Sequence, residues 1–203
     1  GTVYFDAKHL EIKEDASQEC RHCGLSRFLA DGKTPRKILY YNPIEVLLKI
    51  VFGDAKSAAE VSLNREGGEE EKDPTMHDIR DSPYWKELIL KDAEFWEDMR
   101  NIVLKFSTDG FPLDKLMRIS AWAGASQILN KSPQTRSKPH NMLLHWMTTG
   151  GRSPSNLQPI MAVLVDDLLE GWSNGFPLFD ASRQENFTAR VKLLLVSADC
   201  PGK

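Results

Sequence analysis

One apolar run near the end of the chain constrains the fold more than any other feature. Residues Val191–Val196 read Val-Lys-Leu-Leu-Leu-Val and are followed by Ser197, Ala198 and Asp199. A short, nearly continuous apolar run is typical of a strand buried on both faces of a sheet, although a run of this length can also form a core helix. The chain is therefore expected to contain a sheet, with Asp199 directly after one of its strands.

Three earlier runs also predict strands. They cover Ile102–Ser107, Ile119–Leu129 and Pro139–Met147. The first is followed by Asp109 and Gly110, and glycine is a common turn residue. Asp109 is therefore predicted to stand at the end of a strand, as Asp199 does.

The clearest helical pattern lies between the third strand and the final run. Apolar residues from Leu157 to Trp172 recur at i, i+3, i+4 and i+7, which predicts an amphipathic helix. Ser153 or Ser155 is expected to cap its start, and Gly175 follows its end. The second half thus reads β-β-β-α-β, an α/β (α+β) arrangement with a mixed sheet and the helix packed on one face.

The first half is predicted to be mainly helical. One helix should start at Asn42, which can cap it, and a second should cover Ala55–Leu63. Residues Asn64–Asp81 are polar and acidic and are expected to form a loop or linker. Ser82 starts a further helix, with a break near Asp92.

A CxxC pair, Cys20 and Cys23, stands near the start of the chain. It is half of a zinc ribbon or knuckle, whereas a structural zinc site needs four ligands. No second CxxC exists, and the spacing of His9 and His22 matches no zinc pattern. An incomplete half-site is therefore favoured, with Zn²⁺ binding left open. Three cysteines do not make a secreted disulfide framework, which indicates an intracellular, reducing compartment.

These patterns predict three segments. Residues 1–41 form a degenerate zinc-ribbon-like segment, 42–100 a helical segment with the acidic loop 64–81, and 101–203 a sheet-containing domain. The formal net charge of −3 argues against a strongly basic nucleic-acid-binding domain. It does not exclude an enzyme that meets DNA through metal ions and a few cations. No apolar run approaches the ~20 residues that span a bilayer.

Asp109 and Asp199 are the candidate catalytic residues. If their strands are neighbours, the two carboxylates converge at one edge of the sheet, where they need a cation between them or share a proton. Hard oxygen ligands favour Mg²⁺ or Mn²⁺, which can support phosphodiester cleavage. The alternative is that both are ordinary turn acids. Asp166 and Asp167 are a weaker candidate pair, because adjacent acids on an amphipathic helix mostly face water.

Seven short motifs, in order along nearly the whole chain, resemble those of CACTA-type (En/Spm-like) DNA transposases. They are Cys20–Phe28 (similar to CPxCGxSRY), Lys37–Pro43 with Leu47 and Phe52 (KVLxYFPLxxRLxRLF), Asp81–Trp85 (DSPAW), Ser107–Phe111 (ATDGF), Ser120–Trp122 (STWP), Asn141–Leu144 with Ser153 and Pro154 (NxLLxxxxxGxxxP), and Val196–Lys203 (xxADAPAR).

The resemblance implies an RNase H-like fold of the DDE/D superfamily. In that fold the first acid, here Asp109, ends the first strand, and the second, here Asp199, ends the fourth strand beside it. The implied cofactor is Mg²⁺ or Mn²⁺ and the implied partner is DNA, as transposon ends and target, in the nucleus. No small-molecule substrate or membrane is implied, and self-association is left open.

The resemblance also marks departures from the family pattern. The family's third acid lies beyond a further strand, and its upstream cysteine pair would fall near Gly1 and Thr2. The chain is therefore expected to be a fragment truncated at both ends, with a broken zinc site and at most trace cleavage activity alone.

Two non-enzymatic alternatives stay open, and with them the question of whether the chain is an enzyme. One is a degenerate or domesticated remnant that binds DNA or protein. The other is a small CxxC zinc-binding adaptor. The remnant is favoured if the carboxylates of Asp109 and Asp199 lie too far apart to share a metal, or if ion pairs neutralise them.

Overall fold

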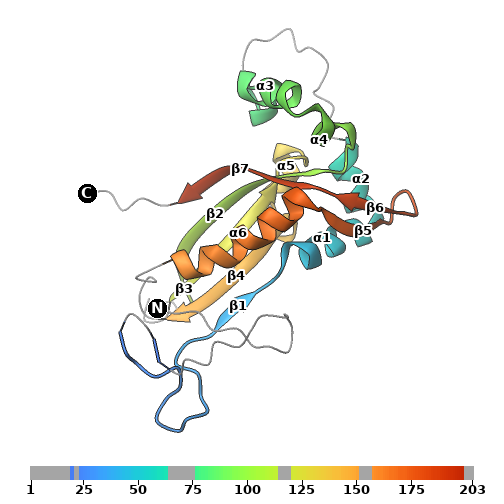
Figure 1. Cartoon of the computed structure of the whole chain (residues 1–203). Helices are drawn as coiled ribbons and strands as arrows, with labels where there is room; N and C mark the ends of the chain where they lie inside the picture. Colours follow the sequence, from blue (N-terminus) through green and yellow to red (C-terminus); the bar gives the residue numbers. More distant parts are fainter. Residues whose placement is uncertain (1–18, 21–22, 64–75, 114–119, 151–156, 199–203) are drawn as a thin grey trace.

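A five-stranded mixed sheet forms the centre of the fold, which a computed structural model describes for residues 19–20, 23–63, 76–113, 120–150 and 157–198 (Figure 1). Its strands, in spatial order, are β1 (Leu39–Tyr41), β4 (Met142–Gly150), β3 (Ser120–Ile128), β2 (Ile102–Pro112) and β7 (Val191–Ala198). The β2 and β7 strands are parallel, and the other neighbours are antiparallel. The predicted mixed sheet with helices is confirmed.

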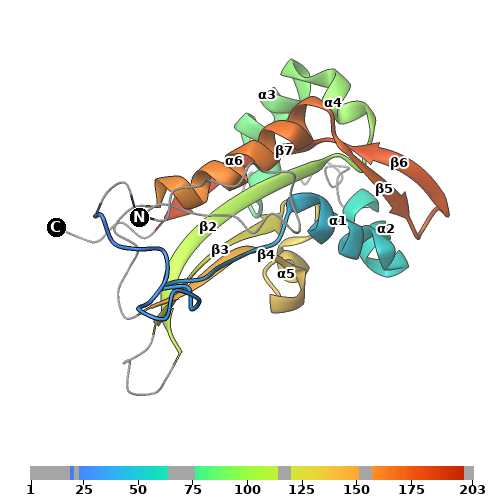
Figure 2. The same ribbon diagram turned by 60° about the horizontal axis from the view of Figure 1, so that its bottom comes forward.

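Helix α6 (Gln158–Ser173) covers one face of this sheet and contacts β7 (Figures 1 and 2). Its Ile160 and Leu164 are buried in the same apolar cluster as Leu104 and Phe106 of β2. Since alternate strand residues point to one face and helix residues three to four apart share a stripe, the two patterns produce this contact directly. The predicted packing of the helix on one face is confirmed.

Two helices of the first half belong to the same core. They are α1 (Ile44–Gly53) and α2 (Ala55–Leu63), and α2 has the predicted bounds. Their buried residues join the cluster around the sheet: Ile44, Leu48, Phe52, Ala58 and Val61. The segments 1–41, 42–100 and 101–203 stay a prediction, but α1 and α2 share one apolar core with the sheet.

A β-hairpin occupies a polar interval that carries no predicted element. Its strands are β5 (Phe176–Asp180) and β6 (Glu185–Ala189), which pair with each other. Residues of β5 alternate between buried and exposed, but over only five residues. The hairpin packs on α1, where the rings of Phe52 and Phe187 meet edge to face at a centroid distance of 4.9 Å.

A second apolar cluster forms under helices α3 (Pro83–Lys91) and α4 (Ala93–Glu97). The predicted break near Asp92 is confirmed, because the side chain of Asp92 caps α4. The expected loop extends less far than predicted. Residues 76–78 are described as loop, and Ile79–Asp81 form the 3-10 helix η1, with a capping box from Asp78.

Two predicted helix caps are wrong. Asn42 does not cap α1, since Pro43 is the N-cap and the Asn42 amide donates to the Leu144 carbonyl at 2.8 Å. Helix α6 begins at Gln158 without a side-chain cap, so neither Ser153 nor Ser155, which lie outside the described residues, stands at its start. The predicted end is confirmed: Asn174 is the C-cap and Gly175 has a positive φ of 72°.

Strand boundaries and burial differ from prediction at two places. The third predicted strand begins only at Met142, after helix α5 (Pro133–Arg136) and a 3-10 turn, η2 (Pro139–Asn141). The final run is a strand, but it is not buried on both faces. Val191 is buried, whereas the side chain of Val196 is 63% exposed. Among the described strands β7 is at the edge of the sheet, so it has a neighbour on one side only.

Candidate functional site

The parallel pairing of β2 and β7 brings two similar sequences side by side. Ser107 pairs with Ser197, and Thr108 pairs with Ala198. In the sequence an aspartate follows each pair: Asp109 follows Thr108, and Asp199 follows Ala198. Neighbouring strands lie about 4.8 Å apart. The structure thus places the residues before both aspartates next to each other, while Asp199 itself lies outside the described residues.

Asp109 lies inside β2 rather than at its end. The strand continues to Pro112, and Asp109 pairs with Ala123 of β3. The prediction that Gly110 marks a turn is therefore wrong. Gly110 is instead required by close packing, because a Cβ there would lie 2.6 Å from the ring of Trp122. The side chain of Asp109 is exposed at the surface of the sheet.

The carboxylate of Asp109 has only a local hydrogen bond. Its Oδ1 accepts from the backbone N–H of Gly110 at 2.7 Å. Within the described residues, no lysine, arginine or histidine forms an ion pair with it. Oxygen atoms that face solvent without a paired cation suit a divalent metal ion. The described part of the chain holds no group of three or more metal-binding side chains.

The cysteine pair lies in a tight turn. The N–H of Gly24 donates to the Cys20 carbonyl at 2.8 Å, and the N–H of Cys20 donates to the Leu25 carbonyl at 2.9 Å. Cys20 is half-buried, Cys23 is exposed, and neither is in a disulfide. Zinc binding by this pair stays a prediction.

The two residues of the weaker candidate pair on α6 have different environments: Asp167 has a structural role, and Asp166 lies at the surface. Asp167 accepts from the Tyr41 hydroxyl at 2.6 Å and from the Ile44 N–H at 3.0 Å, so it fixes the start of α1. Burial, followed by this hydrogen bond, raises the pKa of Tyr41. Asp166 is exposed. Asp167 therefore supplies the anchor of α1 that was predicted for Asn42.

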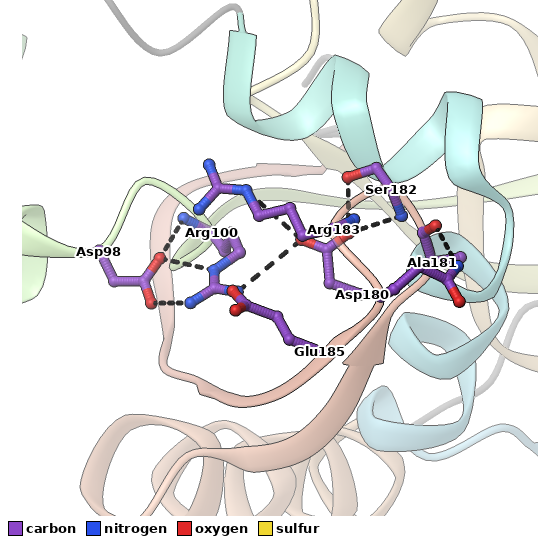
Figure 3. Close-up of polar contacts among 8 residues, drawn as sticks. Asp98, Arg100, Asp180, Ala181, Ser182, Arg183 and Glu185 are labelled. Carbon is purple, nitrogen blue, oxygen red and sulfur yellow. Dashed lines mark hydrogen bonds and ion pairs between the residues drawn. The ribbon is translucent and has the colours of Figure 1, made fainter.

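A second candidate site is the buried carboxylate of Asp180, at the end of β5 (Figure 3). Its Oδ1 accepts from the N–H and hydroxyl of Ser182 at 2.9 and 2.6 Å. Its Oδ2 lies 3.8 Å from Arg100, which also binds Asp98 and Glu185. Since arginine neutralises these carboxylates, the cluster holds the hairpin against the start of β2 and does not suit a metal.

A buried histidine of β4 lies close to Phe106 of β2. His145 of β4 is fully buried, and its Nε2 is 2.8 Å from the Ser126 hydroxyl. Its ring lies 6.2 Å from that of Phe106, centroid to centroid. Burial lowers the pKa of His145 to about 4.

This histidine predicts an acid-sensitive fold. In the unfolded chain its pKa is about 6.5, so between about pH 6.5 and 4 the unfolded state binds more protons and stability falls as pH falls. We expect the free energy of unfolding to be about 2 kcal/mol lower at pH 5 than at pH 7. His145→Gln should remove most of this difference in urea unfolding, and His140→Gln, at an exposed position, should not. Equal pH dependence in both variants would contradict the assignment.

The comparisons with known proteins give the chain a family. The family model described as "Transposase family tnp2" matches residues 73–203, well over half of the 203 residues. That region contains β2 to β7 and both candidate aspartates. Searches of curated proteins and of solved structures found no significant match. Within the described residues, the helices are too short or too polar to cross a membrane. The chain belongs to the transposase family tnp2.

Proposed function

We propose that this chain supplies the first and second metal-binding acids of the nuclease and strand-transfer domain of a CACTA-type DNA transposase. The observation that carries the proposal is the register of β2 and β7, which aligns Ser107-Thr108 with Ser197-Ala198 directly before Asp109 and Asp199. If the two acids were a chance pair, there would be no reason for the residues directly before them to pair on adjacent parallel strands.

The sheet order supports an RNase H-like fold for this domain. The strands β2, β3 and β4 form consecutive antiparallel pairs, and after α6 the chain returns to β7, parallel to β2 and on its other side. This is the arrangement that the resemblance implies, with the fourth strand beside the first. The β1 strand and the β5–β6 hairpin are additions to the predicted β-β-β-α-β order.

The residues around Asp109 fit a divalent ion such as Mg²⁺ or Mn²⁺. The N–H of Gly110 orients one carboxylate oxygen of Asp109, and pairing with Ala123 holds its backbone in the sheet. Asp199 would provide the second carboxylate. A metal bound here would activate water or the 3′ hydroxyl and stabilise the leaving oxygen during cleavage and transfer of DNA.

The second candidate is a non-enzymatic remnant of a transposase. The environment of the Asp109 carboxylate does not favour it. Ion pairs that neutralise the acids would favour a remnant, whereas Asp109 forms no ion pair within the described residues. Membership of a transposase family suggests DNA as a partner. We propose the nucleus as its location.

Manganese binding by the whole chain tests the proposal without requiring cleavage activity. Asp109→Asn and Asp199→Asn should each weaken Mn²⁺ affinity at least roughly tenfold, since loss of even an indirect metal contact has effects of this size. Isothermal titration or the electron paramagnetic resonance of free Mn²⁺ gives the affinity. Asp166→Asn is the control, because it removes one exposed carboxylate from α6. The proposal fails if the chain does not bind Mn²⁺, or if all three variants bind it like the wild type.

A further inference from the structure

A small loop directly before β1 carries an unusual share of positive charge. This basic loop, residues 23–38, is closed by hydrogen bonds from the Leu29 N–H to the Thr34 carbonyl at 2.8 Å and from the Arg36 N–H to the Arg27 carbonyl at 3.0 Å. Gly32, with a φ of 66°, forms its tip. The loop is thus a defined, hairpin-like structure, and most of its side chains are exposed.

The basic loop is positively charged, whereas the whole chain has a negative net charge. The loop contains four basic residues and one acid, a formal charge of +3, whereas the chain carries −3. The basic residues are Arg27, Lys33, Arg36 and Lys37. The acid, Asp31, accepts hydrogen bonds from Lys33 N–H and from Thr34 in its own turn.

Three cations of the basic loop differ from most of the described cations of the folded body. Arg100, Arg136, Arg190 and Lys192 all form ion pairs with carboxylates. Within the described residues, Lys33, Arg36 and Lys37 form none. Their charge therefore stays available to an external anion.

The sheet register connects the basic loop to the candidate site. The loop leads into β1, where Tyr40 pairs with Met147, Met147 with Ala123, and Ala123 with Asp109. These residues form one row across four strands and point to one face of the sheet. Three strand spacings separate the backbones of Tyr40 and Asp109 by about 14 Å. Figures 1 and 2 both show the loop at the end of the sheet where β4 ends and β3 begins.

We propose that the basic loop binds the phosphate backbone of duplex DNA next to the strand held at Asp109, an inference that rests on the proposed function. Phosphates repeat about every 3.4 Å along one strand, so the ~14 Å between the backbones of Asp109 and Tyr40, which lies two residues beyond the loop, corresponds to roughly four steps along one strand. One DNA segment can therefore contact the aspartate and the loop together. The family match begins at residue 73, so the loop is a DNA contact outside the matched region.

Salt-dependent DNA binding by the full chain tests this assignment. The probe is a fluorescein-labelled duplex of random sequence, followed by fluorescence anisotropy over a potassium chloride series with EDTA present. The loop variant is Lys33→Ala/Arg36→Ala/Lys37→Ala. The control, Lys56→Ala/Lys86→Ala/Lys138→Ala, removes the same charge at exposed lysines elsewhere.

We expect the loop variant to lose affinity for the duplex roughly tenfold. The plot of log affinity against log salt concentration should become less steep, with a slope smaller in magnitude by about three, one for each lost phosphate contact. The control should change much less. Lys33→Glu/Lys37→Glu, which keeps the 2.8 Å hydrogen bond from Arg36 to the Ser26 carbonyl, should show a similar loss and so excludes misfolding of the loop as the cause.

Equal losses in the loop variant and the control would overturn the inference and leave the proposed function standing. A wild-type chain that binds Mn²⁺ but no duplex would also overturn it, because the metal site would then exist without this contact.

Discussion

Replacing Trp146 by alanine is expected to lower the free energy of unfolding by about 3–5 kcal/mol. Trp146 of β4 is fully buried and is the largest side chain at the centre of the core. Its ring fills the space above Gly124, next to Phe106. Alanine would leave a cavity between the sheet and the elements that cover it, and urea unfolding monitored by circular dichroism gives the change.

The variant Trp146→Phe tests whether Trp146 stabilises the fold by its apolar packing or by a hydrogen bond from its Nε1. Within the described residues, the Trp146 Nε1 is buried without a hydrogen-bond partner. Phenylalanine removes this unsatisfied donor and keeps most of the apolar volume, so its cost should be well below that of alanine. A Phe variant as unstable as the Ala variant would show that Nε1 has a partner essential to the fold.

Gly124 provides a second test of the same contact. A Cβ at Gly124 would overlap the Trp146 ring and would lie 2.9 Å from the Phe106 ring. We expect Gly124→Ala to cost about 1–3 kcal/mol, and to cost less when Trp146 is already alanine. Gly53→Ala is the control, because a Cβ there meets no atom within 4 Å. Additive effects of the Gly124 and Trp146 changes would contradict the packing described.

Local signals in the sequence predicted the elements whose cause is local. The bounds of α2, the break at Asp92 and the end of α6 at Asn174 follow from residues within one helical turn. Neighbouring residues in the sequence indicate the candidate aspartates, but the adjacency of the residues before them depends on the pairing of Ser107 with Ser197, 90 residues apart by their numbers.

The wrong predictions involve distant partners. Asp109 and Gly110 look like a turn when read alone, but pairing with β3 extends the strand beyond them. Asn42 looks like a cap, yet Asp167 provides that contact from 123 residues beyond Ile44. The β5–β6 hairpin is too short to show a clear alternation, and its packing on α1 stabilises it.

The second large effect is expected at Asp78, whose replacement by asparagine should lower the free energy of unfolding by about 3 kcal/mol. Its side chain is only 6% exposed and lies between two arginines. Arg80 donates to it at 2.5 Å, and Arg136 of α5 donates through both terminal nitrogens. Asparagine would leave two largely buried guanidinium groups without their shared carboxylate. The segment from η1 to α4 would lose its link to α5.

The same residue predicts acid sensitivity in a range below that of His145. Burial raises the pKa of Asp78, but the hydrogen bonds and charges of Arg136 and Arg80 outweigh it, so the pKa lies below its usual value. The stabilisation is therefore present above about pH 4 and is lost as pH falls through the lowered pKa. Urea unfolding of wild type and Asp78→Asn between about pH 5 and pH 2.5 should converge.

Asp31→Asn is the control for Asp78→Asn. It tests whether the loss of stability requires the buried ion pair or follows from replacing any acid with a low pKa. A hydrogen bond from the Thr34 hydroxyl, followed by backbone N–H groups, lowers the pKa of Asp31 to about 2, but the residue is exposed in the basic loop. Solvent screens its interactions, so its loss should leave the unfolding midpoint nearly unchanged. If Asp31→Asn and Asp78→Asn had equal effects, burial between two arginines would not be the source of the stabilisation.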